Sequence, residues 1–237
     1  KGDRAPCGLT CPAHINVQGY VALIAAGKYK EALSLIWENL PLPGILGRIC
    51  PHPCEKECNR KELDKPVAIC ELKRFVADQV KEIQIQKEEA KEERVAIAGS
   101  GPAGLTAAAY LAQKGYPVTI FEALPVTGGM LYTGIPSYRL PRDILEEEIK
   151  TIQSLGVEIK TNAPIGANLT LDDLFRQDYR AIFLAVGAHQ DQKLGVPGEE
   201  NPCVVPGVVF LRKANLGEKV EVGERVGVIG GGNVAID

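Results

Sequence analysis

The sequence lacks the features that would direct it to a membrane, an export pathway or a nucleic acid. No apolar run approaches the roughly 20 residues that a bilayer-spanning helix needs, and neither end reads as a signal peptide. The 27 Lys and Arg nearly balance the 30 Asp and Glu, which leaves a formal net charge of −3. Since neither sign is in excess, nothing points to nucleic acid or an anionic membrane as a partner. A cytoplasmic location is the default expectation.

Cysteine is absent from most of the chain and concentrated near its start. Of the seven cysteines, none lies between positions 70 and 203, so the later part of the chain has no thiol pair for a redox disulfide. An odd total without an export signal argues against a disulfide framework and favours thiols that bind a metal. Cys203 is predicted to be a loop thiol, and His14 and His52 are expected to satisfy local backbone groups. The candidate metal ligands are Cys7, Cys11, Cys50, Cys54, Cys58 and Cys70.

The spacing of these thiols bears on which metal they hold. Cys50, Cys54 and Cys58 stand four residues apart, and Pro51 and Pro53 predict a loop between the first two. Cys54 and Cys58 are then predicted one turn apart on a following helix. Cys-Pro dipeptides recur in loops that hold iron–sulfur clusters, whereas zinc sites usually show C-x-x-C pairs, which are missing here. Iron is therefore favoured, with zinc as the alternative.

Apolar periodicity predicts that about the first 80 residues are helical. Residues 15–40 read as two short helices with a break at Gly27. Residues 66–80 read as an amphipathic helix, whose apolar face is formed by Ile69, Leu72, Phe75 and Val76. The charged stretch 81–94 is predicted to be a solvated helix or a linker that closes this first domain.

From Arg94 the pattern changes to alternating strands and helices. Segments 94–99 and 116–123 read as strands around a helix that ends at Gly115, and a polar helix follows at 143–155. Further strands are expected at 157–160, 181–187 and 224–230, of which the second is predicted to be buried. This alternation predicts a parallel sheet covered by helices, that is, a Rossmann-like α/β domain.

A dinucleotide-binding fingerprint joins the first predicted strand to the first helix of this domain. Gly99, Gly101 and Gly104 form G-x-G-x-x-G, in which the glycines make the turn, admit a pyrophosphate and allow close helix–strand packing. Pro102 suits the first helical turn, and the exposed N–H groups there favour phosphates. Glu122 ends the next strand, where it is placed to accept hydrogen bonds from the ribose diol of FAD or NAD.

A second copy of the fingerprint stands at the end of the chain. Gly230, Gly232 and Ala235 form G-x-G-x-x-A after an apolar segment. Two fingerprints predict two dinucleotides, usually a flavin followed by a nicotinamide. Because the sequence begins at Lys1 and stops at Asp237, it is expected to be a fragment that holds only the opening of the second nucleotide domain.

Two segments between the fingerprints are further candidates for contact with a nucleotide. In 127–141, Gly128 and Gly129 permit close backbone approach, and Arg139 is a candidate to meet a phosphate or a flavin carbonyl. The segment 181–188 ends in small residues that suit either a nucleotide or tight core packing.

These motifs, taken in order along the whole chain, resemble the small (beta) subunit of NADPH-dependent glutamate synthase and its relatives. The relatives include the N-terminal part of dihydropyrimidine dehydrogenase and flavin subunits of ferredoxin-linked NAD(P)H oxidoreductases. The resemblance rests on residues 11–33, 47–58, 66–75, 99–105, 128–141, 181–189 and 228–237. It implies an α-helical domain with two [4Fe-4S] clusters, then a Rossmann-like FAD domain, with an NAD(P)H domain inserted into it.

The resemblance also implies a division of the thiols. Cys7 and Cys58 would serve one cluster, with further ligands from upstream of Lys1. The other cluster would take Cys11, Cys50 and Cys54.

This chain departs from the family pattern in two places. Leu46 stands where the glutamate synthase type has another cysteine, and three residues rather than five separate Cys50 from Cys54. Cys70 is the candidate replacement ligand.

The nucleotide residues carry over position by position. The implied NAD(P)H contacts are Gly230, Gly232 and Asn233, and no catalytic acid, base or nucleophile is nominated. The implied FAD residues are Gly99, Ser100, Gly101, Pro102, Ala103, Gly104, Glu122, Gly129, Leu131, Arg139 and Gly187.

The implied function is an electron-transfer oxidoreductase that passes electrons from NAD(P)H through FAD to iron–sulfur clusters. The electrons would then reach a larger partner subunit, either an amidotransferase or synthase or a ferredoxin-linked enzyme. The alternative is a non-catalytic, zinc-stapled assembly domain that docks on a larger enzyme. The expected division is a helical iron–sulfur domain over 1–85, the first part of the FAD domain over 86–224 and the start of the NAD(P) domain over 225–237. On its own the chain is expected to be inactive with NAD(P)H.

Overall fold

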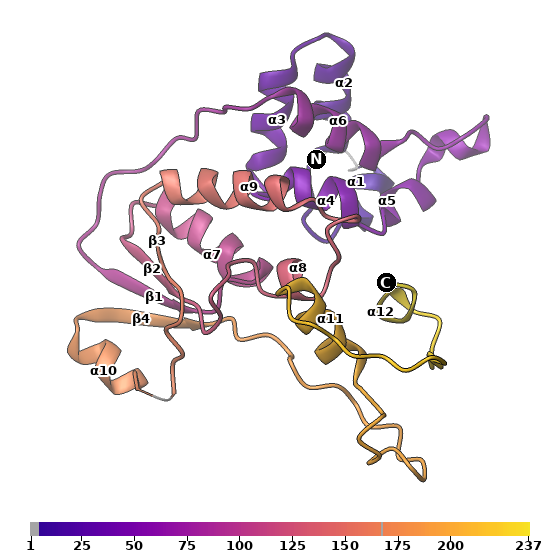
Figure 1. Cartoon of the computed structure of the whole chain (residues 1–237). Coiled ribbons are helices and arrows are strands. Elements are labelled where there is room, and N and C mark those ends of the chain that lie inside the picture. The colour runs from indigo at the N-terminus through magenta and orange to yellow at the C-terminus, as the bar shows by residue number, and fades with distance from the viewer. Residues whose placement is uncertain (1–4, 167) are drawn as a thin grey trace.

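The computed structural model describes residues 5–166 and 168–237, which form a helical unit followed by an α/β unit (Figure 1). The helical unit is a set of short helices around the buried side chains of Tyr20, Ile36 and Val76. Gly27 separates the second helix from the third with a φ of +73°, as the sequence predicts. Its elements are α1 (Pro6–Thr10), α2 (Val17–Ala25), α3 (Tyr29–Trp37), α4 (Pro43–Ile49), α5 (Pro53–Lys56), the 3-10 turn η1 (Asn59–Glu62) and α6 (Ile69–Gln79).

The predicted amphipathic helix is α6, and Ile69, Leu72 and Val76 of its predicted apolar face pack in the helical core, but Phe75 does not. Phe75 is 39% exposed and meets Tyr29 edge-on at the surface, with ring centroids 5.4 Å apart. Lys73 is buried instead, on the same side as Ile69 and Val76. Periodicity therefore identified most of the covered side, but it did not show that Phe75 lies at the surface and Lys73 inside.

Residues 81–93 form an extended strap between the two units, so the linker interpretation of this stretch is correct and the helical one is wrong. Ile83 and Ile85 turn inward against the core of the α/β unit. The backbone N–H of Lys91 donates to the carbonyl of Gly115 at 2.9 Å. A Cβ at Gly115 would lie 2.0 Å from the Glu89 carbonyl oxygen, so only glycine lets the strap pass this closely.

The α/β unit contains a parallel four-stranded sheet in the order β3-β2-β1-β4. Helices α7 and α9 cover one face of the sheet and α10 packs on β4 at the other (Figure 1). The parallel sheet covered by helices is therefore as predicted. The elements are β1 (Arg94–Ala98), α7 (Pro102–Gln113), β2 (Val118–Phe121), α8 (Met130–Thr133), α9 (Arg142–Ser154), β3 (Glu158–Lys160), α10 (Leu171–Arg176), β4 (Tyr179–Leu184), α11 (Gly207–Asn215) and α12 (Asn233–Ile236).

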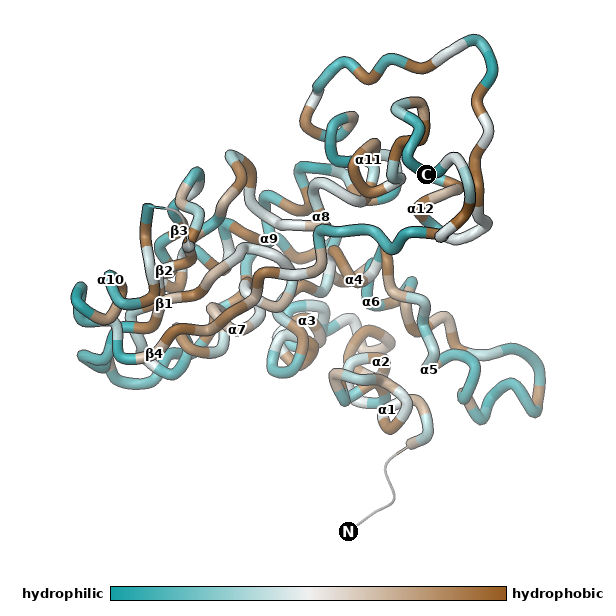
Figure 2. The backbone as a smooth tube through the Cα atoms, turned by 90° about the horizontal axis from the view of Figure 1, so that it is seen from below, coloured by the Kyte–Doolittle hydropathy of each residue, from teal (hydrophilic) through white to brown (hydrophobic). Residues whose placement is uncertain are grey.

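The strand predicted at 181–187 is present as β4, but it is not buried as expected. It lies at the edge of the sheet, where Figure 2 shows its apolar residues, and Phe183 and Leu184 are 43% and 59% exposed. The strand predicted at 224–230 is wrong. The segment 224–230 forms no strand, and its residues are exposed. A strand needs a neighbour to pair its N–H and C=O groups, and among the described residues this segment has none.

The two units share one hydrophobic core. Trp37, Leu42 and Ile45 of the helical unit belong to the same buried cluster as Leu145 and Ile149 of α9. Helix α9 lies between the helical unit and α7 in Figure 1. Among the residues described here, no helix combines the length and apolarity needed to cross a bilayer.

Candidate functional site

The turn between β1 and α7 has the geometry that its three glycines predict. Gly99 has a φ of +105°, and a Cβ there would lie 2.5 Å from the Ala185 carbonyl oxygen. A Cβ at Gly104 would lie 2.0 Å from the Gly99 carbonyl oxygen, which leaves no space for a side chain. A Cβ at Gly101 would meet nothing within 4 Å, so the backbone here faces open space.

The amino end of α7 is suited to an anion. Pro102 occupies its first turn, and no side chain caps it. The N–H groups of a first helical turn carry partial positive charge and have no partner within the helix. An unobstructed glycine backbone beside an uncapped 12-residue helix fits the pyrophosphate of a dinucleotide.

Glu122 is buried directly behind this turn. Its Oε2 accepts hydrogen bonds from the N–H and the hydroxyl of Ser100, at 2.8 and 2.5 Å, and its Oε1 accepts from the N–H of Leu124 at 2.9 Å. A carboxylate offers about four acceptor positions, so these three bonds leave Glu122 capacity for a ribose hydroxyl.

The loop after β2 comes back to the glycine turn. A Cβ at Gly129 would lie 2.8 Å from the Cα of Gly101, and the N–H of Gly128 donates to the hydroxyl of Ser100 at 3.0 Å. Leu131 is buried beneath the loop. The sequence-predicted residues of the first fingerprint and of this loop thus lie together.

Arg142 holds the same loop and was missed in the sequence. Its guanidinium donates to the carbonyls of Leu131 and Ile135 at 3.3 and 2.9 Å and lies 4.4 Å from the centre of the Tyr132 ring. It also donates to the Asn215 side chain on α11 at 3.0 Å. Burial lowers the pKa of Arg142. Arg142 directly follows Pro141 at the start of a polar helix, and nothing in that sequence context indicates these contacts.

Arg139 and Gly187 are two further predicted FAD residues. Arg139 pairs with the carboxylate of Asp237, which also accepts from the hydroxyl of Tyr138. Gly187 follows the edge strand, has a φ of +70° and is exposed.

The predicted thiols gather at the ends of short helices. Cys7 lies in α1, Cys11 ends α1, and Cys50 ends α4. Cys54 lies in α5 and Cys70 in the first turn of α6.

All six of these cysteines are free thiols, and Cys54, Cys58 and Cys70 are buried. The prediction that Cys54 and Cys58 share a helix is wrong, because α5 ends at Lys56 and Cys58 precedes η1. The prediction that Cys203 is a loop thiol is confirmed, since it is exposed outside any helix or strand.

Cys50 has the electrostatic setting of a metal ligand. The neighbouring thiol of Cys70 lowers the pKa of Cys50 to about 5, and the N–H of His52, which donates to the sulfur at 3.3 Å, acts in the same direction. The same pairing raises the pKa of Cys70. Lys73 is buried on α6, and its charge favours the thiolate form of both. A thiolate is the form in which cysteine binds metal.

The other thiols are linked by their mutual charge effects. Burial, together with the charges of nearby Cys11 and Cys50, raises the pKa of Cys54 to about 11. Burial also raises the pKa of Cys7, with added effects from Cys58 and Cys11. Cys7 therefore lies within electrostatic reach of Cys58 and Cys11, Cys54 of Cys11 and Cys50, and Cys70 of Cys50.

The surroundings of the thiols fit an iron–sulfur group better than a bare ion. In the described parts of the chain, no three Cys, His, Asp or Glu side chains are already gathered as a metal-binding group. A cavity of about 190 Å³ is lined by Cys7, Cys58 and mainly apolar side chains. Its lining residues are Ala5, Pro6, Cys7, Val17, Gln18, Val21, Cys58, Asn59, Arg60, Val67 and Ile69. An all-thiol donor set, an apolar lining and an N–H donated to sulfur are features of iron–sulfur sites.

The two histidines near the thiols serve the backbone, as predicted. Nδ1 of His14 lies 3.3 Å from the Gly8 carbonyl oxygen, and Nδ1 of His52 lies 3.2 Å from that of Cys50.

The second fingerprint is exposed to solvent. Gly230 and Gly232 lie in an exposed segment before the four-residue α12, which begins at Asn233.

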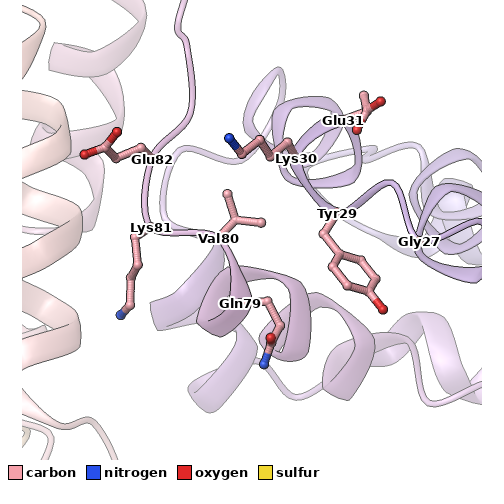
Figure 3. A pocket seen from close by; sticks show the side chains of 8 residues that line it. All are labelled: Gly27, Tyr29, Lys30, Glu31, Gln79, Val80, Lys81 and Glu82. Carbon is pink, nitrogen blue, oxygen red and sulfur yellow. The ribbon is translucent and has the colours of Figure 1, made fainter.

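A hollow of about 590 Å³ lies between the start of α3 and the strap, and Figure 3 shows Tyr29, Lys30 and Val80 on its lining. It contains no predicted site residue.

Comparison with protein families decides the class. Residues 93–237 match the family described as pyridine nucleotide-disulphide oxidoreductase. The chain belongs to this family. Residues 1–85 match the family described as dihydropyrimidine dehydrogenase domain II, 4Fe-4S cluster. The two matched families describe an oxidoreductase domain that uses a pyridine nucleotide and a domain that holds a 4Fe-4S cluster, in agreement with the predicted cofactors. The resemblance to relatives of dihydropyrimidine dehydrogenase is confirmed.

Individual relatives are longer than this chain. It is 48% identical to the NADP(+)-dependent formate dehydrogenase subunit beta of Moorella thermoacetica, covering 98% of this chain and 37% of that protein. It is 45% identical to the NADPH-Fe(3+) oxidoreductase subunit beta of Geobacter sulfurreducens, covering 98% of this chain and 36% of that protein. The chain thus spans little more than a third of these relatives.

A solved structure of 2-naphthoyl-CoA reductase shares the fold. Its TM-score is 0.53 at 22% identity, over 82% of this chain and 30% of that one.

Proposed function

We propose that this chain is an electron-entry module that takes electrons from NAD(P)H and delivers them singly to a larger partner subunit. When bound, the flavin accepts a hydride's two electrons and the clusters carry one electron at a time. The observation that carries the proposal is the joining of a thiol-bearing helical unit and a glycine-turn nucleotide unit through one hydrophobic core. The match to a 4Fe-4S family supports this over the zinc-stapled assembly domain.

We assign the thiols to two clusters. Cys11, Cys50, Cys54 and Cys70 would hold one cluster, with Cys70 as its fourth ligand; the charge effects of Cys11 and Cys50 on Cys54, and of Cys50 on Cys70, support this grouping. Cys7 and Cys58 border the 190 Å³ cavity and would contribute to the other.

The flavin would lie on the β1–α7 turn. The open backbone at Gly101 and the uncapped first turn of α7 would bind its pyrophosphate, and Glu122 its ribose. The close approach of Gly129 to Gly101 supports the loop 127–141 as the other wall. Arg139 and Gly187 remain proposed contacts.

The nicotinamide nucleotide would bind at Gly230, Gly232 and Asn233, within the domain that begins at about residue 225. The names of the two relatives mention NADP(+) and NADPH, which supports NADPH as the donor. Both are called beta subunits, which supports a larger electron-accepting partner. The proposed domain division remains 1–85, 86–224 and 225–237, and the clustered thiols support a cytoplasmic location.

The test is metal, sulfide and flavin analysis of the chain purified under nitrogen. We expect iron and acid-labile sulfide in equal amounts together with FAD, and a yellow-brown absorbance that dithionite bleaches. A colourless preparation that contains zinc and no flavin would overturn the proposal in favour of the assembly domain.

A further inference from the structure

Helix α4 begins at a buried end that cannot cap itself. Leu42 stands at the N-cap position and has no polar side chain, and Pro43 has no N–H. The first free donors are the N–H groups of Gly44 and Ile45, and both Leu42 and Ile45 are buried away from water. Unpaired donors at such a helix end are costly.

Glu148 of α9 supplies the missing cap from the other unit. Its Oε1 accepts from the N–H of Gly44 at 2.6 Å, and its Oε2 accepts from the N–H of Ile45 at 3.0 Å. A Cβ at position 44 would lie only 3.0 Å from Oε1, so the glycine makes room for the carboxylate. Glu148, which is 104 positions from Gly44 in the sequence, thus provides the capping acceptor that a Ser or Asp at the N-cap position usually provides.

Helix α4 is in turn fixed to the helix that carries Cys70. Arg48 donates to both carboxylate oxygens of Asp78 on α6, at 2.9 and 3.1 Å. The thiol of Cys70 donates to the Gly47 carbonyl at 3.5 Å, and Cys50 is the residue that ends α4. Any displacement of α4 therefore moves Cys50 relative to the α/β unit.

On the other side, α9 contacts the glycine loop. A Cβ at Gly128 would lie 3.1 Å from Cδ2 of Leu145. Leu145 and Glu148 are three residues apart and so lie side by side on α9. Leu145 thus contacts the loop that approaches Gly101, and Glu148, one helical turn later, caps α4.

We propose that Glu148 is a positioning residue that fixes the thiol-bearing helices relative to the nucleotide loop by capping α4. This role rests on the proposed function, because the cap matters for electron transfer only if it sets the position of the Cys50 thiol relative to a bound flavin. The contacts themselves do not depend on that function. Glu148 faces the two backbone N–H groups of Gly44 and Ile45. The charged side chains near it are those of Arg48 and Asp78.

The test is hydrogen–deuterium exchange of the chain purified under nitrogen, read separately for peptides of α4 and of the β1–β2 sheet. Glu148→Ala removes both acceptors, and the isosteric Glu148→Gln keeps one. Glu146→Gln is the matched control, because Glu146 is an exposed residue on the same helix. We expect exchange in residues 42–49 to rise by about tenfold or more in Glu148→Ala and by less in Glu148→Gln. The sheet peptides and the control should exchange as in the wild type.

A second readout follows the thiols. The midpoint potential of the iron–sulfur signal should shift in Glu148→Ala and stay unchanged in Glu146→Gln. Unchanged exchange in 42–49 overturns the proposal. So does wild-type behaviour of Glu148→Gln, because a side chain that only fills space would tolerate the isosteric amide. A rise that is equally large in the sheet also overturns it. Failure of the proposed function would appear separately, as wild-type protein without iron and flavin, and would leave the exchange data interpretable.

Discussion

The hydroxyl of Ser100 donates a 2.5 Å hydrogen bond to Oε2 of Glu122, and both residues are buried. The same hydroxyl accepts the N–H of Gly128 at 3.0 Å. The residue between the first two glycines of the fingerprint therefore joins the β1–α7 turn, the acid that follows β2 and the glycine loop. Three segments that would surround one nucleotide are fixed by one small side chain.

Replacing Ser100 with Ala should weaken FAD binding without unfolding the chain. The change leaves the Gly128 N–H without its acceptor and removes one donor from Glu122, so we expect the Kd for FAD to rise by about ten- to a hundredfold. Titration of the flavin-free protein with FAD measures this. Ser154→Ala is the control, because that hydroxyl only donates to Thr151 at the exposed end of α9. An unchanged Kd would show that the hydroxyl does not organise the site.

Cys70 should be required for one cluster and not for the other. If it is the fourth ligand beside Cys50, Cys70→Ala should remove the iron of the cluster assigned to Cys11, Cys50 and Cys54, because a cubane cluster takes four thiolates. Iron and sulfide analysis under nitrogen measures the loss. The exposed Cys203 provides the control as Cys203→Ala. Full iron content in Cys70→Ala would show that Cys70 is not a cluster ligand and that its thiol only donates hydrogen bonds to carbonyls of α4.

Lys73 should raise the reduction potential of the cluster held by Cys50. This lysine is only 5% exposed, and its charge favours the thiolate forms of Cys50, Cys54 and Cys70. A nearby cation stabilises the more negative, reduced cluster, so Lys73→Met should lower the midpoint potential by on the order of 50 mV.

A redox titration followed by electron paramagnetic resonance measures the potential of this cluster. Lys73→Arg keeps the charge and should shift the potential less. Lys56→Met, at an exposed position, should leave the potential unchanged. A potential that stays the same or rises in Lys73→Met would contradict the charge effect.

Local features of the chain were predictable from the sequence. The break at Gly27, the turn at Gly99 and the close packing at Gly104 each follow from a residue type whose backbone freedom or small size has few substitutes. The association of Ser100 with Glu122 was within reach, because the fingerprint already places both at the same end of the sheet.

Long-range partners were not predictable. The strand at 181–187 was expected to be buried because it is apolar, but burial depends on neighbours, and β4 has only β1 beside it. Glu148 looks like any acid in a polar helix, and only the tertiary structure brings it to α4. The one local hint was the start of α4 itself, where Leu42 and Pro43 leave a helix without a capping side chain.

Glu148 should make the stability of the chain fall as the pH rises through neutrality. Burial raises the pKa of its carboxyl to about 7 from an ordinary 4.5, although the N–H groups of Ile45 and Gly44 and the charge of Arg48 act in the opposite direction. A carboxyl whose pKa is higher in the folded state binds more protons there than in the unfolded chain. Its stabilising contribution is therefore complete below about pH 4.5 and is lost as the pH rises through 7.

Between pH 5 and pH 8 this loss should amount to about 2 to 3 kcal/mol in the free energy of unfolding. It should be absent in Glu148→Gln, which has no proton to lose. The single tryptophan, Trp37, is buried in the same core as Ile45 and Leu145, so its fluorescence during urea unfolding under nitrogen reports on this region. Because other groups titrate in this range, the quantity to compare is the difference between the wild type and Glu148→Gln at each pH. Glu146→Gln should follow the wild type throughout, and parallel curves for the wild type and Glu148→Gln would show that Glu148 keeps one protonation state across this range.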